Sequence, residues 1–324
     1  MTEPVQKVVL TEFTDGIRIF RLDRLTTNAC GNKEFKLSAN IQQLKRSGAT
    51  GVLSFGGVWS NHLHAFAIAC RANNLHAVAV VRGEAVHGST LLDNAVEHGL
   101  VVHYVSRSDY RRRHDESYVK ELMAVLNCDA WLPEGGSNNL AVQCCAEITA
   151  LVNSSVDQTP ENIALAVGTG ATMAGIINGA VAGQNIIGVP VVQDNRLQAS
   201  VKNWVEKTSR ADWCFLSPAD PQKYASVDRS LLEFVLQAYR DSGVILDPVY
   251  NAKALRYLQK VRLLDETRDP CIFIHTGGLG GCLGFAEALL AIDTQLAGEL
   301  LSEVSRLLDS VSYTHLTLPT ICSV

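Results

Sequence analysis

The stretch from Gly51 to Val81 reads GVLSFGGVWSNHLHAFAIACRANNLHAVAVV, and its pattern indicates the fold class. A short apolar run, residues 51–55, ends in the glycine pair Gly56-Gly57. An amphipathic segment follows from about residue 60 to residue 73, and a second apolar run covers residues 77–81. Strand, glycine turn, helix and strand in this order predict two parallel strands joined by a crossover helix.

The same alternation continues on both sides of this stretch. Residues 17–22 alternate in the manner of a half-buried strand, and a helix is expected from about residue 37 to residue 47. After the loop at residues 153–160 the pattern restarts, which places a domain boundary near residues 147–160. The sequence therefore predicts two α/β domains with mostly parallel strands and helices on both faces. Further strands are expected at 101–105, 130–132, 163–167, 186–192 and 271–275, and helices at about 90–98, 116–126, 139–151, 172–182, 230–239 and 252–264.

Composition narrows the function classes. The chain has 324 residues, of which 47% are hydrophobic and 19% charged, as expected of a soluble protein with a packed core. A formal net charge of −5 argues against nucleic acid as the main partner, since phosphate binding requires a basic surface. Residues 1–7 do not resemble a signal peptide, and we expect no membrane-spanning segment, because no apolar stretch reaches the required length. Nine cysteines without metal-ligand spacing predict free thiols, a cytoplasmic protein and no metal site.

One lysine has two alternative interpretations. Lys33 stands in the stretch GNKEFKL, residues 31–37, between a glycine turn and the expected first turn of a helix. Most lysines in such positions are solvated surface charges. The functional alternative is a Schiff-base lysine, whose amine condenses with an aldehyde cofactor. That chemistry requires a lowered pKa, which a neighbouring cation such as Lys36 can provide.

Glycine-rich turns follow four predicted strands, at residues 56–57, 135–136, 168–170 and 277–278. In open α/β sheets, ligands bind beyond the carboxyl ends of the strands. The turn Gly168-Thr169-Gly170-Ala171-Thr172 fits a phosphate site, because small residues let backbone N–H groups approach the oxygens at a helix N-terminus. Ser60-Asn61-His62 lies at another helix N-terminus, which suits a carboxylate, although Ser60 as a simple helix cap explains it equally well.

Taken together, these motifs resemble the aminocyclopropane-carboxylate deaminase and D-cysteine desulfhydrase family of pyridoxal-phosphate enzymes, which have fold type II. The resemblance covers about residues 20–285 and implies two open α/β domains like tryptophan synthase β, with the cofactor in the cleft between them. Residues 1–37 plus 147–311 would form the larger domain and residues 38–146 the smaller one. Six blocks carry it in order: GNKEFKL (31–37), FGGVWSNH (55–62), PEGGSN (133–138), VGTG (167–170), DPVY (247–250) and IHTGG (274–278).

The resemblance also implies roles for single residues. Lys33 would bind the cofactor through its amine and later move the substrate proton. Asn61 would hydrogen-bond the phenolic oxygen of pyridoxal phosphate, and Gly168 to Thr172 would hold its phosphate. Ser60, with Asn61 and His62 beside it, would bind the substrate carboxylate. Tyr224 and Tyr250 match tyrosines that line the substrate side.

Two departures from the family pattern bear on the substrate. The deaminases carry a glutamate after the DPVY block, where this chain has Asn251, which can only hydrogen-bond the pyridine nitrogen and leaves a weaker electron sink. Around Tyr224 the usual glycines are replaced, because residues 222–226 read QKYAS. We therefore expect a lyase that deprotonates Cα of a small amino acid and eliminates its β-substituent, giving a keto acid and ammonia. A D-cysteine desulfhydrase-like reaction that releases sulfide ranks first.

Two alternatives remain open from the sequence. One is aminocyclopropane-carboxylate deaminase activity, and the other is a cofactor-carrying protein that binds amino acids with little turnover. Related enzymes suggest a homodimer, with no membrane partner. Residues 312–324 follow neither period and resemble read-through of non-native DNA, so they are left out of the predicted fold.

Overall fold

The computed structural model describes residues 10–14, 16–26, 30–83, 90–191, 195–216, 227–264 and 269–309. The chain forms two compact units, one from residues 1–32 with 142–324 and the other from residues 33–141. The second unit begins five residues before the expected smaller domain (38 − 33) and ends five residues before its expected limit (146 − 141). We call these units the large unit and the small unit.

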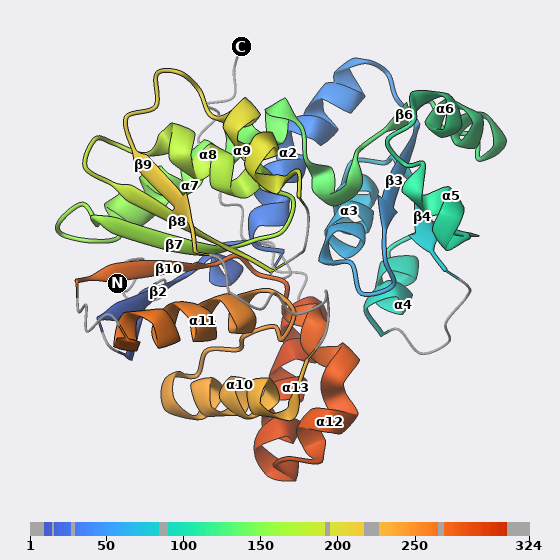
Figure 1. The fold of residues 1–324 in the computed structure, drawn as a ribbon. Coiled ribbons are helices and arrows are strands. Elements are labelled where there is room, and N and C mark those ends of the chain that lie inside the picture. The colour runs from blue at the N-terminus through green and yellow to red at the C-terminus, as the bar shows by residue number, and fades with distance from the viewer. Residues whose placement is uncertain are drawn as a thin grey trace, which may run out of the picture. The chain divides into compact units, whose positions relative to one another are not determined.

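The large unit is built on a six-stranded sheet with the order β1-β2-β10-β7-β8-β9. Only β1 runs antiparallel to its neighbour, and the remaining pairs are parallel. Helices α7, α8 and α9 cover one face of this sheet, whereas α10 and α11 lie on the other (Figure 1). The strands are β1 (Leu10–Thr14), β2 (Ile17–Arg21), β7 (Asn162–Val167), β8 (Asn185–Pro190), β9 (Asp212–Phe215) and β10 (Cys271–His275).

The helices of the large unit join these strands or follow them. They are η1 (Leu22–Arg24), α7 (Asn139–Ser154), α8 (Ala171–Gly179), α9 (Leu197–Trp204), α10 (Arg229–Ser242), α11 (Asn251–Leu264), η4 (Leu279–Phe285), α12 (Ala286–Leu290) and α13 (Thr294–Asp309). Strands β7 and β10 are central and almost fully buried, which explains their continuous apolar runs.

The small unit has a parallel four-stranded sheet with the order β5-β4-β3-β6. On one face, side chains such as Phe55 and Val80 pack against Tyr110 and Leu122 from the helices α5 and α6. Its elements are α2 (Asn32–Arg46), β3 (Gly51–Gly56), α3 (Asn61–Ala72), β4 (His76–Arg82), α4 (Thr90–Glu97), β5 (Leu100–Val105), α5 (Arg107–Arg111), α6 (Glu116–Val125), β6 (Ala130–Trp131) and η3 (Glu134–Gly136).

The fold class predicted from the alternating pattern is confirmed, since both sheets are mostly parallel and both units alternate strand and helix. One boundary prediction near the key lysine is wrong: α2 begins at Asn32, not near Leu37. Strands β1 and β9 and the helices α5, α9, α12 and α13 were not predicted. Both of these strands lie at the edges of the large sheet, where partial burial weakens the apolar pattern.

Within the described residues, no helix combines the length and apolar composition needed to cross a membrane. The eight described cysteines are all free thiols, and no cluster of metal-binding side chains occurs in the same ranges.

Candidate active site

The helix that carries Lys33 starts at a point fixed by backbone contacts. Gly31 has φ +57, and a Cβ atom at this position would lie 2.1 Å from the carbonyl oxygen of Thr276. The Asn32 N–H donates to the same oxygen at 3.1 Å. Only glycine permits this approach, and the bond starts α2 five residues earlier than its apolar period indicates. Lys33 is the next residue, in the first turn, and is half-buried.

The predicted phosphate loop lies beside this helix start. The Asn32 side chain donates from Nδ2 to Thr172 Oγ1 at 2.8 Å. Gly170, in the left-handed region at φ +89, precedes α8 and gives it no side-chain cap. Within the described part of the chain, the N–H groups of Ala171 and Thr172 have no protein partner. Uncapped N–H groups at the positive end of a nine-residue helix fit a phosphate group.

Tyr250 lies against the same loop. A Cβ atom on Gly168 would come within 3.2 Å of the Tyr250 ring, so the ring covers the start of the loop and a larger residue would displace it. The backbone of Tyr250 is held by Asp247, whose Oδ1 accepts the Tyr250 N–H at 2.7 Å. Tyr224, the other predicted tyrosine, lies outside the described residues.

Asn251 is completely buried, and its amide is fully engaged by the protein. Nδ2 donates to Asp247 Oδ2 at 2.6 Å and to the Gly277 carbonyl at 2.8 Å. Oδ1 accepts from the N–H and the hydroxyl of Thr276, at 3.2 and 3.3 Å. An amide offers two hydrogens and two acceptor sites, so in this state Asn251 has no hydrogen left for a ligand.

In the small unit, Ser60 and Asn61 form the start of α3. Ser60 is the N-cap, and its Oγ accepts the Leu63 N–H at 3.3 Å. The predicted capping role is therefore confirmed, and the hydroxyl keeps its own hydrogen for a further bond. Among the described residues, the N–H groups of Asn61 and His62 have no protein acceptor, so this helix end also suits an anion.

The His62 ring is a buried neutral base. It is 3% exposed, stacks on Phe66 and contacts Ser54 Oγ through Nε2 at 2.8 Å. Because the Ser54 hydroxyl donates to the Leu132 carbonyl, Nε2 carries the hydrogen, and Nδ1 is a lone pair that has no partner among the described residues. Burial, with Lys33 and Lys36 nearby, lowers the pKa of His62 to about 3. The side chain therefore offers no positive charge to a substrate carboxylate at neutral pH.

Lys36, the neighbour expected to influence Lys33, binds a different element. It is 2% exposed, and its Nζ donates to the Gly135 carbonyl at 3.3 Å and to Ser137 Oγ at 3.1 Å. Asn40, one turn further along α2, exchanges hydrogen bonds with Asn138 at 2.7 and 3.2 Å. The loop after β6 is thus bonded to the helix that carries the key lysine.

The predicted site residues therefore fall into two described groups. In the large unit, Thr172 is bonded to Asn32, Tyr250 lies against Gly168, and Asn251 is bonded to Thr276, whose carbonyl accepts the Asn32 N–H. In the small unit, Lys33 shares one neighbourhood with His62, and Ser60 and Asn61 begin the helix that carries this histidine. Sequence reasoning missed two residues that organise the first group, Asn32 and Thr276. Both stand inside quoted motifs, directly beside Lys33 and Gly277, which was the available signal.

Comparison with known proteins identifies the family. Residues 13–277 match the model of the family described as pyridoxal-phosphate dependent enzymes. A bifunctional D-cysteine desulfhydrase/1-aminocyclopropane-1-carboxylate deaminase of Arabidopsis thaliana is 29% identical over 86% of this chain and 76% of its own length. A putative 1-aminocyclopropane-1-carboxylate deaminase of Pyrococcus abyssi is 26% identical, over 81% of this chain and 84% of that protein.

A solved structure shows the same fold. The crystal structure described as an ACC deaminase homologue superposes with a TM-score of 0.71 at 23% identity, covering 85% of this chain and 88% of that one. The resemblance drawn from the six sequence blocks is confirmed by these relatives.

Proposed function

This chain belongs to the family of pyridoxal-phosphate-dependent enzymes, and on that premise we propose that it is a β-eliminating lyase of small amino acids. It removes the Cα proton and expels the β-substituent, and water then hydrolyses the resulting enamine to a keto acid and ammonia. The substrate that we rank first is D-cysteine, with sulfide as the leaving group. The observation that carries this proposal is the Asn32–Thr172 bond, which joins the start of the lysine-bearing helix to a loop that fits a phosphate.

The chain's own residues divide the work in the following way. Lys33 would hold the cofactor through its amine, and once the substrate amine has replaced it there, the free amine would take the Cα proton. The loop from Gly168 to Thr172 holds the phosphate with its N–H groups, and Asn61 hydrogen-bonds the phenolic oxygen. When bound, pyridoxal phosphate supplies the electron sink for the carbanion.

The substrate carboxylate is assigned to the start of α3. Ser60 keeps a hydroxyl hydrogen, and the N–H groups of Asn61 and His62 point out of the first turn, where the helix dipole favours an anion. His62 takes part through its backbone, because its buried ring is neutral. Tyr224 and Tyr250 keep their predicted places on the substrate side, and Tyr250 is supported by its contact with Gly168.

Asn251 favours elimination over cyclopropane opening. Its amide cannot protonate a pyridine nitrogen, and its two hydrogens already bond to Asp247 and Gly277. Opening an unactivated carbon ring demands a stronger electron sink than expelling a thiolate from the β-carbon. Aminocyclopropane-carboxylate deaminase activity, carried by name in the relatives, is therefore the second candidate.

A substrate panel tests this proposal. The reconstituted enzyme is incubated with D- and L-cysteine, D- and L-serine, and aminocyclopropane carboxylate, and keto acid, ammonia and sulfide are measured. We expect D-cysteine to be turned over fastest. Lys33→Ala should lower kcat at least about 1,000-fold, because the cofactor loses its attachment and the proton its acceptor.

The matched control is Lys45→Ala, which removes a lysine from the last turn of the same helix and should retain wild-type kcat. Full turnover by a folded Lys33→Ala protein would contradict the catalytic assignment. A wild-type protein that binds the cofactor but releases no keto acid would favour an amino-acid-binding protein with little turnover.

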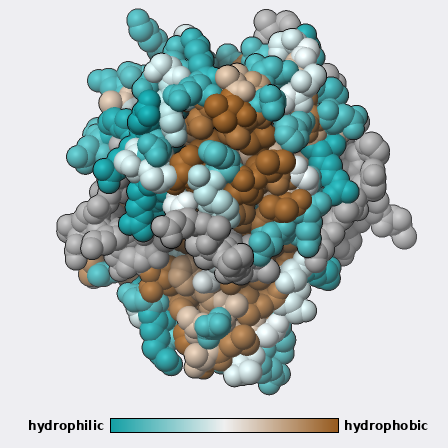
Figure 2. All heavy atoms as spheres, turned by 90° about the vertical axis from the view of Figure 1, so that its right-hand side faces the viewer, coloured by the Kyte–Doolittle hydropathy of each residue, from teal (hydrophilic) through white to brown (hydrophobic). Residues whose placement is uncertain are grey.

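We further propose a cytoplasmic homodimer. The described cysteines are all free, as in a reducing compartment. Figure 2 shows hydrophobic residues in the upper middle and again in the lower part of one face, and exposed apolar surface is a feature of protein interfaces. Light scattering on the purified protein measures its molar mass, which is about two chain masses for a homodimer and about one for a monomer.

A further inference from the structure

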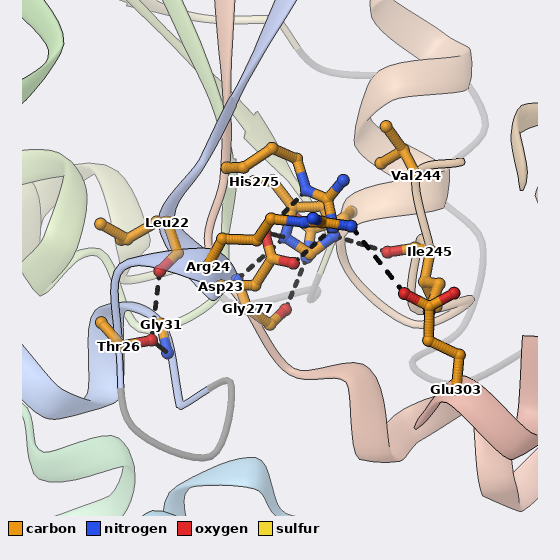
Figure 3. Close-up of polar contacts among 12 residues, drawn as sticks. Leu22, Asp23, Arg24, Thr26, Gly31, Val244, Ile245, His275, Gly277 and Glu303 are labelled. Atoms are coloured by element: carbon orange, nitrogen blue, oxygen red, sulfur yellow. Dashed lines mark hydrogen bonds and ion pairs between the residues drawn. The ribbon is translucent and has the colours of Figure 1, made fainter. Parts of the chain in front are cut away.

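A buried ionic cluster lies at the ends of β2 and β10. Arg21 and Asp23 are 2% and 4% exposed and form a two-point pair, with Nε to Oδ1 at 2.9 Å and Nη2 to Oδ2 at 2.6 Å. His275, the last residue of β10, is completely buried, and its Nδ1 lies 3.3 Å from Asp23 Oδ1. Figure 3 shows Asp23 and His275 meeting beside Gly277 and Ile245.

The hydrogen bonds of His275 define its useful form. Nε2 lies 2.7 Å from the Ile245 carbonyl, which can only accept, so Nε2 carries a hydrogen. Nδ1 accepts the Gly277 N–H at 3.2 Å, and this requires a lone pair on Nδ1. A second proton on the ring would point from Nδ1 toward Asp23 and take that acceptor away from Gly277.

The Gly277 N–H belongs to the peptide that starts the lysine helix. This peptide joins Thr276 to Gly277, and its carbonyl oxygen, on Thr276, accepts the Asn32 N–H at 3.1 Å. His275 therefore holds the N–H side of the peptide while α2 is bonded to the C=O side. The Gly277 carbonyl is tied in turn to Asn251 Nδ2. Lys33 follows Asn32 directly.

Charged groups of both signs lie around His275. The charge of Asp23 is matched by Arg21, at 2.6 Å, with Arg24 close by. Asp247 reaches the ring electrostatically from the segment before α11. The Gly277 N–H donates to Nδ1 at 3.2 Å, so the role described below uses the lone pair on that nitrogen.

We propose that His275, supported by Asp23, is a positioning residue for Lys33, acting through the peptide between Thr276 and Gly277. Its Nδ1 lone pair fixes that peptide, the peptide fixes the first N–H of α2, and the first turn of α2 orients the catalytic amine. This inference rests on the proposed function only in naming Lys33 as the catalytic group. A displacement of about 1 Å in such a group costs up to about 100-fold in rate.

Two variants separate this role from simple packing. His275→Asn retains an amide group near the position of Nδ1 and can still accept from Gly277, whereas His275→Gln moves its amide toward the position of Nε2 and leaves that N–H without an acceptor. The control is Arg24→Gln, which removes the half-exposed pair between Arg24 and Glu303 beside the cluster. Hydrogen exchange of residues 30–36 and steady-state kinetics are measured on each folded holoenzyme.

We expect His275→Gln to speed exchange at residues 30–36 about 10-fold or more and to lower kcat about 10–100-fold, with KM within about threefold. His275→Asn should restore both readouts to within about threefold of wild type, and Arg24→Gln should change neither. Equal behaviour of the Asn and Gln variants, or unchanged exchange in the Gln variant, would overturn the proposal.

If His275→Gln does not fold, His275→Asn still decides the matter, because raised exchange at residues 30–36 in that variant contradicts the acceptor role. Hydrogen exchange does not depend on the substrate. A wild-type protein without turnover would refute the proposed function while the exchange measurement still tested the positioning role.

Discussion

His62 in the small unit and His275 in the large unit are both buried, but the charged groups around them are of opposite sign. His62 in the small unit has Lys33 and Lys36 as its charged neighbours, and its pKa falls to about 3. His275 in the large unit lies 3.3 Å from the Asp23 carboxylate, with Asp247 also within electrostatic reach. Both rings are at most 3% exposed, so burial alone does not distinguish them.

The difference lies in what each ring is bonded to. His62 donates to Ser54, which donates in turn to the Leu132 carbonyl, and the other ring nitrogen is a lone pair that has no partner among the described residues. Both nitrogens of His275 are bonded, and one of them leads through a single peptide to the start of α2. The groups that a buried histidine is bonded to, and not its burial, therefore indicate whether it has a functional role.

The largest effect is expected from the ionic cluster around His275. Asp23→Asn leaves the Arg21 guanidinium buried without its counter-charge, and we expect a loss of about 3–5 kcal/mol in the free energy of unfolding. Denaturant titration at neutral pH measures it. The double variant Arg21→Gln, Asp23→Asn should recover part of that loss. A single variant as stable as wild type would show that the cluster carries little of the large unit's stability.

Substitution of one glycine in each unit compares the two regions directly. Gly31 and Gly136 have similar left-handed conformations, at φ +57 and +64. A Cβ on Gly31 would lie 2.1 Å from the Thr276 carbonyl, whereas one on Gly136 would lie 3.3 Å from the His62 ring. We expect Gly31→Ala to cost about 3 kcal/mol and Gly136→Ala about 1–2 kcal/mol, because backbone gives way less than a side chain. Equal losses in thermal or denaturant unfolding would remove the distinction.

The smallest effect concerns acid stability and His62. Its folded-state pKa of about 3 lies below the value of about 6.5 for an exposed histidine, so the unfolded chain binds more protons between these values. Stability therefore falls as the pH falls through this window, by about 2 kcal/mol between pH 7 and pH 5. His62→Gln should lack this loss, whereas replacement of the exposed His76 should retain it. The same drop in His62→Gln would assign it to another group.

The sequence predicts the elements and the motifs of this protein well because both are local. Alternating apolar runs specify the strands, and the stretch GNKEFKL singles out Lys33 by its residue types and their order. Partners that lie far apart in the chain are not visible in this way. The bond from Asn32 to Thr172 spans 140 residues, and Lys36 reaches Gly135 across 99 residues.

The same limit explains one wrong helix boundary and one set of contacts that the sequence does not show. The start of α2 depends on Thr276, which no local capping rule can identify from the residues before Lys33. The engagement of Asn251 likewise depends on Gly277 and Thr276 from a different strand end. The residue type at position 251 predicts a weaker electron sink, but only the structure shows that its amide is already occupied.

The most direct test of the account is the absorbance spectrum of the purified protein loaded with pyridoxal phosphate, recorded before and after borohydride reduction. We predict a visible band that disappears on reduction, and a pyridoxyl mass that peptide mapping locates on Lys33. The Lys33→Ala protein should show neither. A protein that develops no such band, or a reduced adduct located on another lysine, would contradict the assignment on which the proposed mechanism is built.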